Sequence, residues 1–406
     1  MFDYDAILGK TGDSLKRTIT WQTAGTKPYG KILFGCGLAK AVGDEAAKLG
    51  KEKALVVTDK TVVDLKVADV VVRSLEASGF KVVVFSDVEP EPRIEVADAA
   101  AEVARKGSYG VVIGLGGGSA IDTSKAAAIA AGNPGPILDY VTGKPFEAPG
   151  LPKILIPTTS GTGSEVSNSF VFSKDGKKVF AGHAMLFADV ALIDPILTST
   201  MPPAITAGTG LDALCHAVEG LIHPKAYTMG DALSAKSIEL VFKYLPRATK
   251  NGGDIEARYY MSWASSLGMM SYNWTGGLYA HSVSYVLTHF LKAGHGFGCG
   301  ISLPYTLMFD IDLVRDKLKY MAKAIGVPEA VGDAPMAAIR RSWELLAEVG
   351  LPQGLKEMGV ERSAIELYAR ELIEKYYRPF NPRPMNLEQA VQLFESMWDG
   401  QLRPIA

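Results

Sequence analysis

The chain has 406 residues and a net charge of -2, with 48% hydrophobic and 21% charged residues. This balance has no basic excess that would recruit nucleic acid, and the length favours two domains over one core. The first residues lack the positive start and apolar run of a signal peptide, and no segment is predicted to reach the roughly 18 apolar residues of a membrane span. Three widely spaced cysteines fit reduced thiols, so a cytoplasmic protein is expected.

The first half of the chain alternates short apolar strands with helical stretches. Strands are predicted at residues 29–37, 54–59, 81–88, 109–116 and from 153 onward, and the pattern predicts a parallel sheet covered by helices on both faces. A hairpin turned at Asp175 and Gly176 and a last strand in DVALIDP follow. Helical patterns dominate from about residue 200. The sequence therefore predicts an α/β domain over residues 1–200 and a helical domain over residues 201–406, with a cleft between them.

The strand at residues 109–116 runs into a glycine turn and then a helix. Gly117, Gly118 and Ser119 make this turn, and Asp122 lies early in the helix. Glycines let backbone N–H groups approach a phosphate closely, and the N–H groups of a helix start complement its charge. A pyrophosphate site is therefore predicted, although a plain strand-to-helix turn would use the same residues. The match is not the G-x-G-x-x-G fingerprint of dinucleotide-binding folds.

A second polar turn follows the strand that begins at residue 153. It contains Thr158, Thr159, Ser160 and Thr162. Hydroxyl groups at the carboxyl end of a parallel strand are typical of a ligand crevice, and a plain loop is the alternative. Asp59 ends the strand at residues 54–59 and so lies at the same edge of the predicted sheet. There it would either contact a nucleotide or cap the following helix.

The second half contains a pattern of metal ligands. Asp212 and His216 stand four apart in an apolar helical segment, which puts both side chains on one face of a helix. His281 is expected on a second helix and His295 in the loop after a break at Gly294. One carboxylate and three imidazoles suit Fe²⁺ or Zn²⁺, whereas Ca²⁺ and Mg²⁺ prefer oxygen. Any one of these histidines could instead be a hydrogen-bonded core residue.

The order of the motifs GGGSAID, PTTSGTGSE, LIDP, MPP and GLDALCHAVEG, with the histidine pair that ends in HG, resembles the iron-containing (group III) alcohol dehydrogenase family over residues 29–400. The resemblance implies an N-terminal domain that binds NAD(P), a helical domain that holds one divalent metal, and catalysis in the cleft between them. It implies the metal ligands Asp212, His216, His281 and His295. It implies cofactor contacts from Gly117, Gly118, Ser119, Asp122, Thr158, Thr159, Ser160 and Thr162, and from Lys178 near the ribose.

Two positions depart from this family. Many relatives have a second histidine four residues after the third ligand, where this chain has Tyr285. A phenol can relay a proton but does not titrate near neutrality, so His289, one turn further on, is a second candidate for the proton path. Glu91 replaces an asparagine associated with the cofactor side. Asp59 matches an aspartate beside the adenosine ribose, which favours NAD over the 2′-phosphate of NADP.

We therefore expect an NAD-dependent alcohol dehydrogenase or aldehyde reductase with Fe²⁺, or alternatively Zn²⁺, that acts on a small-molecule alcohol or aldehyde. Tyr272, Trp274, Tyr279 and Tyr285 precede or share the helix of His281, and if they line the pocket rather than the core they favour a small or aromatic uncharged substrate. The chain is expected to form a homo-oligomer, a dimer or larger, with no nucleic-acid or membrane partner.

Two other functions were weighed against this expectation. A metal- and NAD-dependent lyase or cyclase of the dehydroquinate synthase type would need a cluster of Lys and Arg near the ligands to bind a polyanionic substrate. Residues 264–300 contain one Lys, Lys292, and no Arg, which argues against this function. A non-catalytic NAD-binding or scaffold protein would have no use for a four-ligand set.

Overall fold

The structure is a computed structural model that describes residues 2–22, 30–50, 52–328 and 330–405. Its internal contacts divide the chain into two units. Unit 1 comprises Met1–Thr159 and Gly163–Met201, and unit 2 comprises Ser160–Thr162 and Pro202–Ala406. Each unit has its own core and is described by itself.

Unit 1 is built on a sheet in the order β1-β2-β9-β6-β5-β3-β4. Its strands are β1 (Ile19–Gln22), β2 (Lys31–Phe34), β3 (Lys53–Asp59), β4 (Lys81–Val88), β5 (Val111–Gly116), β6 (Lys153–Pro157) and β9 (Val190–Ile193). Every described neighbouring pair is parallel except β1 with β2. The central strand β5 is buried along its whole length, as a sheet covered on both faces requires. The predicted mostly parallel α/β fold is confirmed.

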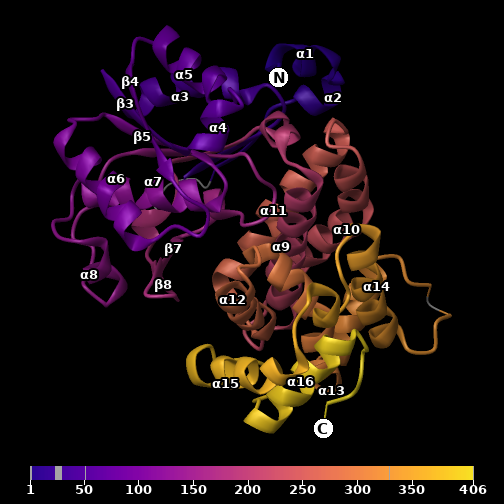
Figure 1. The fold of residues 1–406 in the computed structure, drawn as a ribbon. Coiled ribbons are helices and arrows are strands. Elements are labelled where there is room, and N and C mark those ends of the chain that lie inside the picture. Colours follow the sequence, from indigo (N-terminus) through magenta and orange to yellow (C-terminus); the bar gives the residue numbers. More distant parts are fainter. Residues whose placement is uncertain (1, 23–29, 51, 329, 406) are drawn as a thin grey trace. The chain divides into compact units, whose positions relative to one another are not determined.

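Helices cover the two faces of this sheet (Figure 1). Helices α3 (Val42–Leu49) and α5 (Ala68–Ala77) lie on one face, and α6 (Ile94–Lys106) and α7 (Gly118–Ala130) lie on the other. Shorter helices are α1 (Tyr4–Lys10), α2 (Asp13–Lys16), α4 (Lys60–Asp64) and α8 (Ile137–Val141). A separate hairpin joins β7 (Ser169–Lys174) to β8 (Lys177–Gly182). It turns at Asp175 and Gly176, which both have positive φ, as the sequence predicts.

The connections of the sheet reverse direction between two neighbouring strands. From β3 the chain continues to β4 on one side, and from β5 it continues to β6 on the other. In open α/β sheets, ligands bind outside the carboxyl ends of the strands at such a point. Asp59 ends β3 and Gly116 ends β5, so the topology favours a ligand crevice beside these two residues.

The described residues of unit 2 form helices joined by loops, with no strand among them. Its main helices are α9 (Pro203–Ile222), α10 (Thr228–Lys250), α11 (Ile255–Thr275), α12 (Tyr279–Leu291), α13 (His295–Ala324), α14 (Ala334–Glu348), α15 (Ile365–Lys375) and α16 (Leu387–Asp399). They share one large apolar core. The sequence predicted no membrane span, yet α13 is long and apolar enough to be considered as one. The most apolar stretch of α13 is 78% buried inside the protein, as in a core helix.

The expectation that His295 lies in a loop is wrong, because His295 is the first residue of α13. The loop was expected because Gly294 ends the preceding helix, but α13 begins directly after Gly294, and the glycines that follow His295 serve close helix packing. A Cβ atom on Gly296 would lie 2.3 Å from the carbonyl oxygen of Gly208 in α9. A Cβ atom on Gly298 would lie 2.6 Å from Ser284 Oγ in α12. The missing side chains therefore let α13 approach both helices that carry the other predicted ligands.

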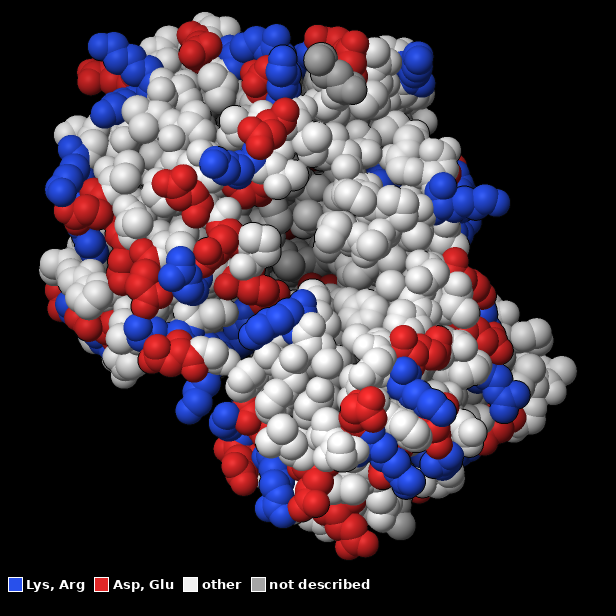
Figure 2. Space-filling model, viewed as in Figure 1, with Lys and Arg blue, Asp and Glu red and all other residues white. Residues whose placement is uncertain are grey.

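Charged residues of both signs are interspersed over the face shown in Figure 2, and neither sign forms one continuous patch there. This agrees with the net charge of -2.

Candidate metal centre and dinucleotide site

Three helices of unit 2 bring the four predicted ligands together. Asp212 and His216 lie one turn apart on α9, His281 lies in the first turn of α12, and His295 begins α13. The Oδ1 atom of Asp212 lies 4.0, 3.8 and 3.7 Å from the Nε2 atoms of His216, His281 and His295. Two donors that share a metal with bonds of about 2.0–2.2 Å are roughly 3.5 Å apart. Asp212, His281 and His295 have donor atoms within 4.8 Å of one another, together with Cys299, which is the spacing of a metal site. His216 is not part of this mutually close group, although its Nε2 atom lies 4.0 Å from Asp212 Oδ1.

Two of these donor atoms are buried without a hydrogen-bond partner. Asp212 Oδ1 and His281 Nε2 have none among the described residues. Leaving a buried polar atom unpaired costs about 1–3 kcal/mol, and more for a charged group, so such atoms are expected to have a ligand. Burial also lowers the pKa of His216 to about 4, which keeps its imidazole neutral at pH 7. A neutral imidazole is the form that binds a metal. These residues fit a divalent transition metal.

Glu219 supports this centre, and the sequence reasoning missed it. It lies on α9 and is almost fully buried. Its carboxylate lies 2.7 Å from His281 Nδ1 and accepts from the backbone N–H groups of Leu278 (2.8 Å) and His281 (3.2 Å). A proton held on Nδ1 leaves Nε2 of His281 available to a metal. Glu219 was visible in the motif GLDALCHAVEG, three residues after His216.

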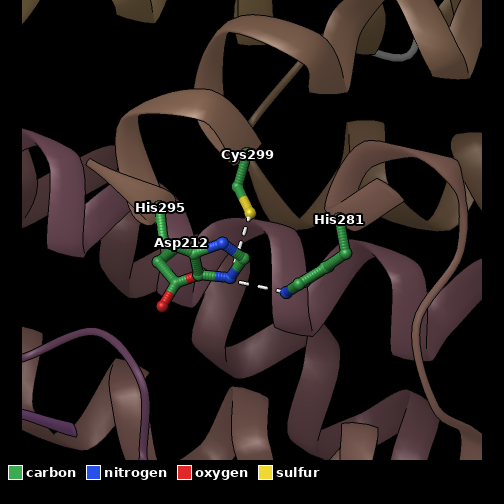
Figure 3. Close-up of side chains that lie close together, drawn as sticks. All are labelled: Asp212, His281, His295 and Cys299. Carbon is green, nitrogen blue, oxygen red and sulfur yellow. Dashed lines mark hydrogen bonds and ion pairs between the residues drawn. The ribbon is translucent and has the colours of Figure 1, made fainter. Parts of the chain in front are cut away.

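Cys299 is a second neighbour that the sequence reasoning left without a role. It lies on α13 one turn after His295, and its Sγ lies 3.6 Å from His295 Nε2. Figure 3 shows Asp212, His281, His295 and Cys299 with their side-chain ends gathered together. Burial raises the pKa of Cys299 well above its usual range, which favours the protonated thiol. Sulfur is also a good ligand for Zn²⁺, so the donor set does not by itself choose between Fe²⁺ and Zn²⁺.

The two predicted proton-relay residues have different surroundings. The ring of Tyr285 stacks on that of His295, with centroids 5.3 Å apart and an interplanar angle of 17°. Burial raises the pKa of Tyr285 to about 12, so its hydroxyl is protonated at neutral pH. His289 instead has its Nδ1 atom 3.0 Å from Glu371 Oε1 and stacks on Phe290. Of the two, only Tyr285 contacts one of the four predicted ligands through a described interaction.

The glycine turn of unit 1 has the form of an anion site. Gly117 is the N-cap of α7, and no side chain caps that helix. A Cβ atom on Gly117 would lie 3.3 Å from Thr159 Cγ2, so the two predicted polar turns adjoin each other here. Gly116 has a φ of +150°, which favours glycine. Backbone N–H groups at an uncapped helix start, framed by a threonine, suit a phosphate.

The two carboxylate oxygens of Asp59 have different surroundings. Its Oδ1 accepts from the N–H of Val62 at 3.0 Å and so caps α4. Its Oδ2 points toward Gly116, where a Cβ atom would lie 3.3 Å away. One carboxylate oxygen therefore has a structural role, and the other lies beside the glycine turn.

Several other predicted cofactor residues are held by contacts within their own unit. The carboxylate of Asp122 is buried and accepts from Ser164 Oγ at 2.5 Å and Val171 N at 2.9 Å. Lys178 Nζ pairs with the carboxylate of Glu91 and donates to Ser173 Oγ. In unit 2, Ser160 Oγ lies 3.0 Å from Ser262 Oγ. Further predicted residues are Gly118 and Ser119 in the first turn of α7, the buried Thr158 after β6, and Thr162 in unit 2.

Known proteins resemble this chain over nearly its whole length. Residues 29–195 match the family described as iron-containing alcohol dehydrogenase, and residues 206–398 match its C-terminal family. Long-chain-alcohol dehydrogenase 1 of Geobacillus thermodenitrificans is 36% identical over 91% of this chain and 95% of that protein.

Solved structures show the same likeness. A crystal structure of 1,3-propanediol oxidoreductase superposes with a TM-score of 0.86 at 29% identity, covering 90% of this chain and 97% of that one. Sulfoacetaldehyde reductase from Bifidobacterium kashiwanohense, solved in complex with NAD⁺, has a TM-score of 0.83 at 32% identity. That match covers 93% of this chain and 99% of the other.

Proposed function

The chain belongs to the iron-containing alcohol dehydrogenase family and is an oxidoreductase that interconverts alcohols and aldehydes; from this premise we propose how its own residues carry out the reaction. The metal ligands are Asp212, His216, His281 and His295. The observation that carries this assignment is the pair of buried, unpartnered atoms, Asp212 Oδ1 and His281 Nε2, between helices that pack through glycine. A divalent ion held there would act as a Lewis acid on the alcohol or carbonyl oxygen.

The protein residues hold and orient the reactants. Glu219 fixes the ring of His281 through Nδ1. Tyr285, protonated because burial raises its pKa to about 12, donates a hydrogen bond toward the substrate oxygen and relays a proton to it during reduction. Hydride transfer is the chemistry of the nicotinamide, and the residues around it exclude water and set the distance.

The cofactor residues are those around the switch point of unit 1. The N–H groups of Gly118 and Ser119 bind the pyrophosphate after the turn at Gly117, and Thr158 and Thr159 line the dinucleotide, with Ser160 and Thr162 further along the same loop. The Oδ2 atom of Asp59 accepts from the ribose hydroxyls of NAD and repels the 2′-phosphate of NADP, so NAD is the preferred cofactor.

The native metal is proposed to be Fe²⁺, with Zn²⁺ as the alternative, because the nitrogen and oxygen donors accept either ion. Cytoplasmic location is proposed from three buried, free cysteines.

A homo-oligomer is also proposed, and light scattering of the purified protein would measure its mass.

The test is a substrate panel with anaerobically purified, metal-replete protein. Alcohols with NAD and aldehydes with NADH are followed by the absorbance of the reduced nicotinamide, and metal content is measured on the same samples. We expect turnover that a chelator removes and Fe²⁺ or Zn²⁺ restores. Absence of turnover on every substrate with both NAD and NADP, at full metal occupancy, would contradict the proposal.

A further inference from the structure

We propose that Arg378 binds an anionic group, a carboxylate or a sulfonate, of the alcohol or aldehyde substrate. This inference rests on the proposed function, because it names the substrate class of the same site. Arg378 lies in the segment after α15, 93 residues beyond Tyr285 in the chain, so no sequence motif connects it with the ligands. An anionic substrate differs from the uncharged substrate that the sequence analysis expected.

Contacts place the guanidinium of Arg378 beside the metal centre. Its Nε donates to Ser282 Oγ at 2.8 Å, and this hydroxyl in turn donates to the carbonyl oxygen of Tyr376 at 2.7 Å. The guanidinium carbon lies 5.9 Å from the ring centroid of Tyr285, and a hydrogen bond links the two side chains. Tyr285 itself stacks on His295. One aromatic ring therefore separates Arg378 from a ligand.

His295 is the most exposed of the four predicted ligands, and Arg378 lies one aromatic ring away from it. The side chains of His216, His281 and Asp212 are 6%, 2% and 3% exposed, whereas that of His295 is 23% exposed. A substrate must therefore reach the centre past His295. Tyr285, which stacks on His295, and Arg378 are both half-buried.

The positive charge of Arg378 has no direct counter-charge. Among the described residues no carboxylate forms a salt bridge with it. By contrast, the more exposed Arg247 and Arg362 pair with Asp254 and Glu395. A half-buried guanidinium that is held by the hydroxyl of Ser282 and by Tyr285, and that has no salt bridge among the described residues, can bind a carboxylate or sulfonate through its fork of N–H groups.

The charge count of the centre points the same way. The nearest buried carboxylates are Asp212 and Glu219, and they balance the charge of one divalent ion. Glu219 also influences Arg378 at longer range, but it is occupied by His281 and two backbone N–H groups. Arg378 adds a positive charge near the centre, which an anionic substrate would neutralise and a cationic one would oppose.

The test compares aldehydes that carry an anionic group with uncharged counterparts, which in two of the three pairs are the methyl esters of the acids. Glyoxylate is compared with methyl glyoxylate, succinate semialdehyde with methyl 4-oxobutanoate, and sulfoacetaldehyde with propanal, each with NADH and the metal-replete enzyme. The wild-type protein is expected to prefer the anion in at least one pair by about 10- to 100-fold in kcat/KM, the effect of one charged hydrogen-bonded contact. The pair with the largest preference identifies carboxylate or sulfonate and the distance of the charge from the carbonyl.

Two variants of Arg378 distinguish binding of the substrate anion from positioning of Tyr285. Arg378→Gln should bring the acid-to-ester ratio to about one, and Arg378→Lys should keep part of it because the charge remains. If Arg378 only positions Tyr285, acid and ester will lose activity together and the ratio will stay unchanged, which overturns the proposal. Arg370→Gln, which removes an exposed arginine of α15 that pairs with Glu366, is the matched control and should keep the wild-type ratio.

A binding measurement gives a readout that does not depend on turnover. Calorimetric titration of propanoate and of ethanesulfonate into the enzyme with NAD should show binding of at least one anion that Arg378→Gln abolishes, at unchanged metal content. If Arg378→Gln does not fold, the wild-type ratios and Arg378→Lys decide the matter. Wild-type preference for the uncharged partner in all three pairs overturns this inference and leaves the proposed function intact, whereas no turnover of any aldehyde contradicts the proposed function itself.

Discussion

The two candidate sites are made of different parts of the polypeptide. The glycine turn at Gly117 in unit 1 offers backbone N–H groups to an anion, and glycine leaves the space in front of them free because it has no Cβ atom. The candidate metal centre in unit 2 offers side chains, and two of its atoms, on Asp212 and His281, are buried without a hydrogen-bond partner among the described residues. The comparison teaches that the first site is damaged by added atoms and the second by removed ones.

The largest expected effect is the loss of a ligand. His281→Ala removes one of four donors and leaves an incomplete site that loses its metal readily. Bound metal and activity should both fall, by more than the roughly 10- to 100-fold loss expected for a residue that only supports a ligand. Metal analysis after dialysis measures the change. His223→Gln, at the end of α9, is the control and should keep its metal. Full metal and full activity in His281→Ala would show that the ligand assignment is wrong.

The next effect comes from the residue that orients this ligand. Glu219→Gln keeps the size of the side chain but replaces a carboxylate that pairs with His281 Nδ1. An amide N–H facing Nδ1 favours the tautomer with the proton on Nε2, which cannot bind a metal. Metal affinity should fall by roughly 10- to 100-fold, measured by competition with a chromophoric chelator. An unchanged affinity would mean that Glu219 serves only the backbone N–H groups of α12.

In unit 1 the informative change is an addition. Gly117→Ala places a Cβ atom 3.3 Å from Thr159 Cγ2, at the mouth of the anion site. The dissociation constant for NADH should rise on the order of tenfold, equivalent to about 1.4 kcal/mol, while metal content is unchanged. Fluorescence titration of NADH measures this. Gly9→Ala in α1 is the control, because no atom lies within 4 Å of its added Cβ. Equal NADH affinity in the two variants would place the pyrophosphate elsewhere.

The smallest effect concerns Asp59, whose two oxygens have different tasks. Asp59→Ser keeps an N-cap acceptor for α4 but removes the charge, whereas Asp59→Gly removes both. Because Asp59 is half-buried and partly screened by solvent, kcat/KM with NADP should rise only severalfold relative to NAD in both variants. Only Asp59→Gly should also lose a few tenths of a kcal/mol of stability in thermal unfolding. An unchanged cofactor ratio in both variants would leave Asp59 as a cap alone.

The parts of the sites that sequence could predict are those fixed by local spacing. Asp212 and His216 had to share a face of α9 because four residues make about one helical turn. The alternation of strands and helices likewise predicted the sheet that ends in Asp59 and Gly116. The position of His295 was misjudged because glycine lowers helix propensity, while tertiary packing at Gly296 and Gly298 decided the outcome.

The parts that sequence could not predict depend on distant segments. Near the ligands in sequence, residues 264–300 contain one Lys, Lys292, and no Arg, but the chain returns after α15 and brings Arg378 to Tyr285. No periodicity reports a contact between segments so far apart. Glu219 was different, because its position one turn after His216 could have been read as the support that metal-binding histidines usually have.

The boundary between the units passes through the loop after β6, and this has a consequence for how the protein can be divided. The chain changes unit after Thr159, after Thr162 and after Met201. Proteolysis at Met201 would therefore not release two complete halves, because residues 160–162 would stay covalently attached to the other fragment. The helical fragment would lose Ser160, the partner of Ser262. If the two units were exchanged between related proteins, residues 160–162 would have to be exchanged together with the helices of unit 2.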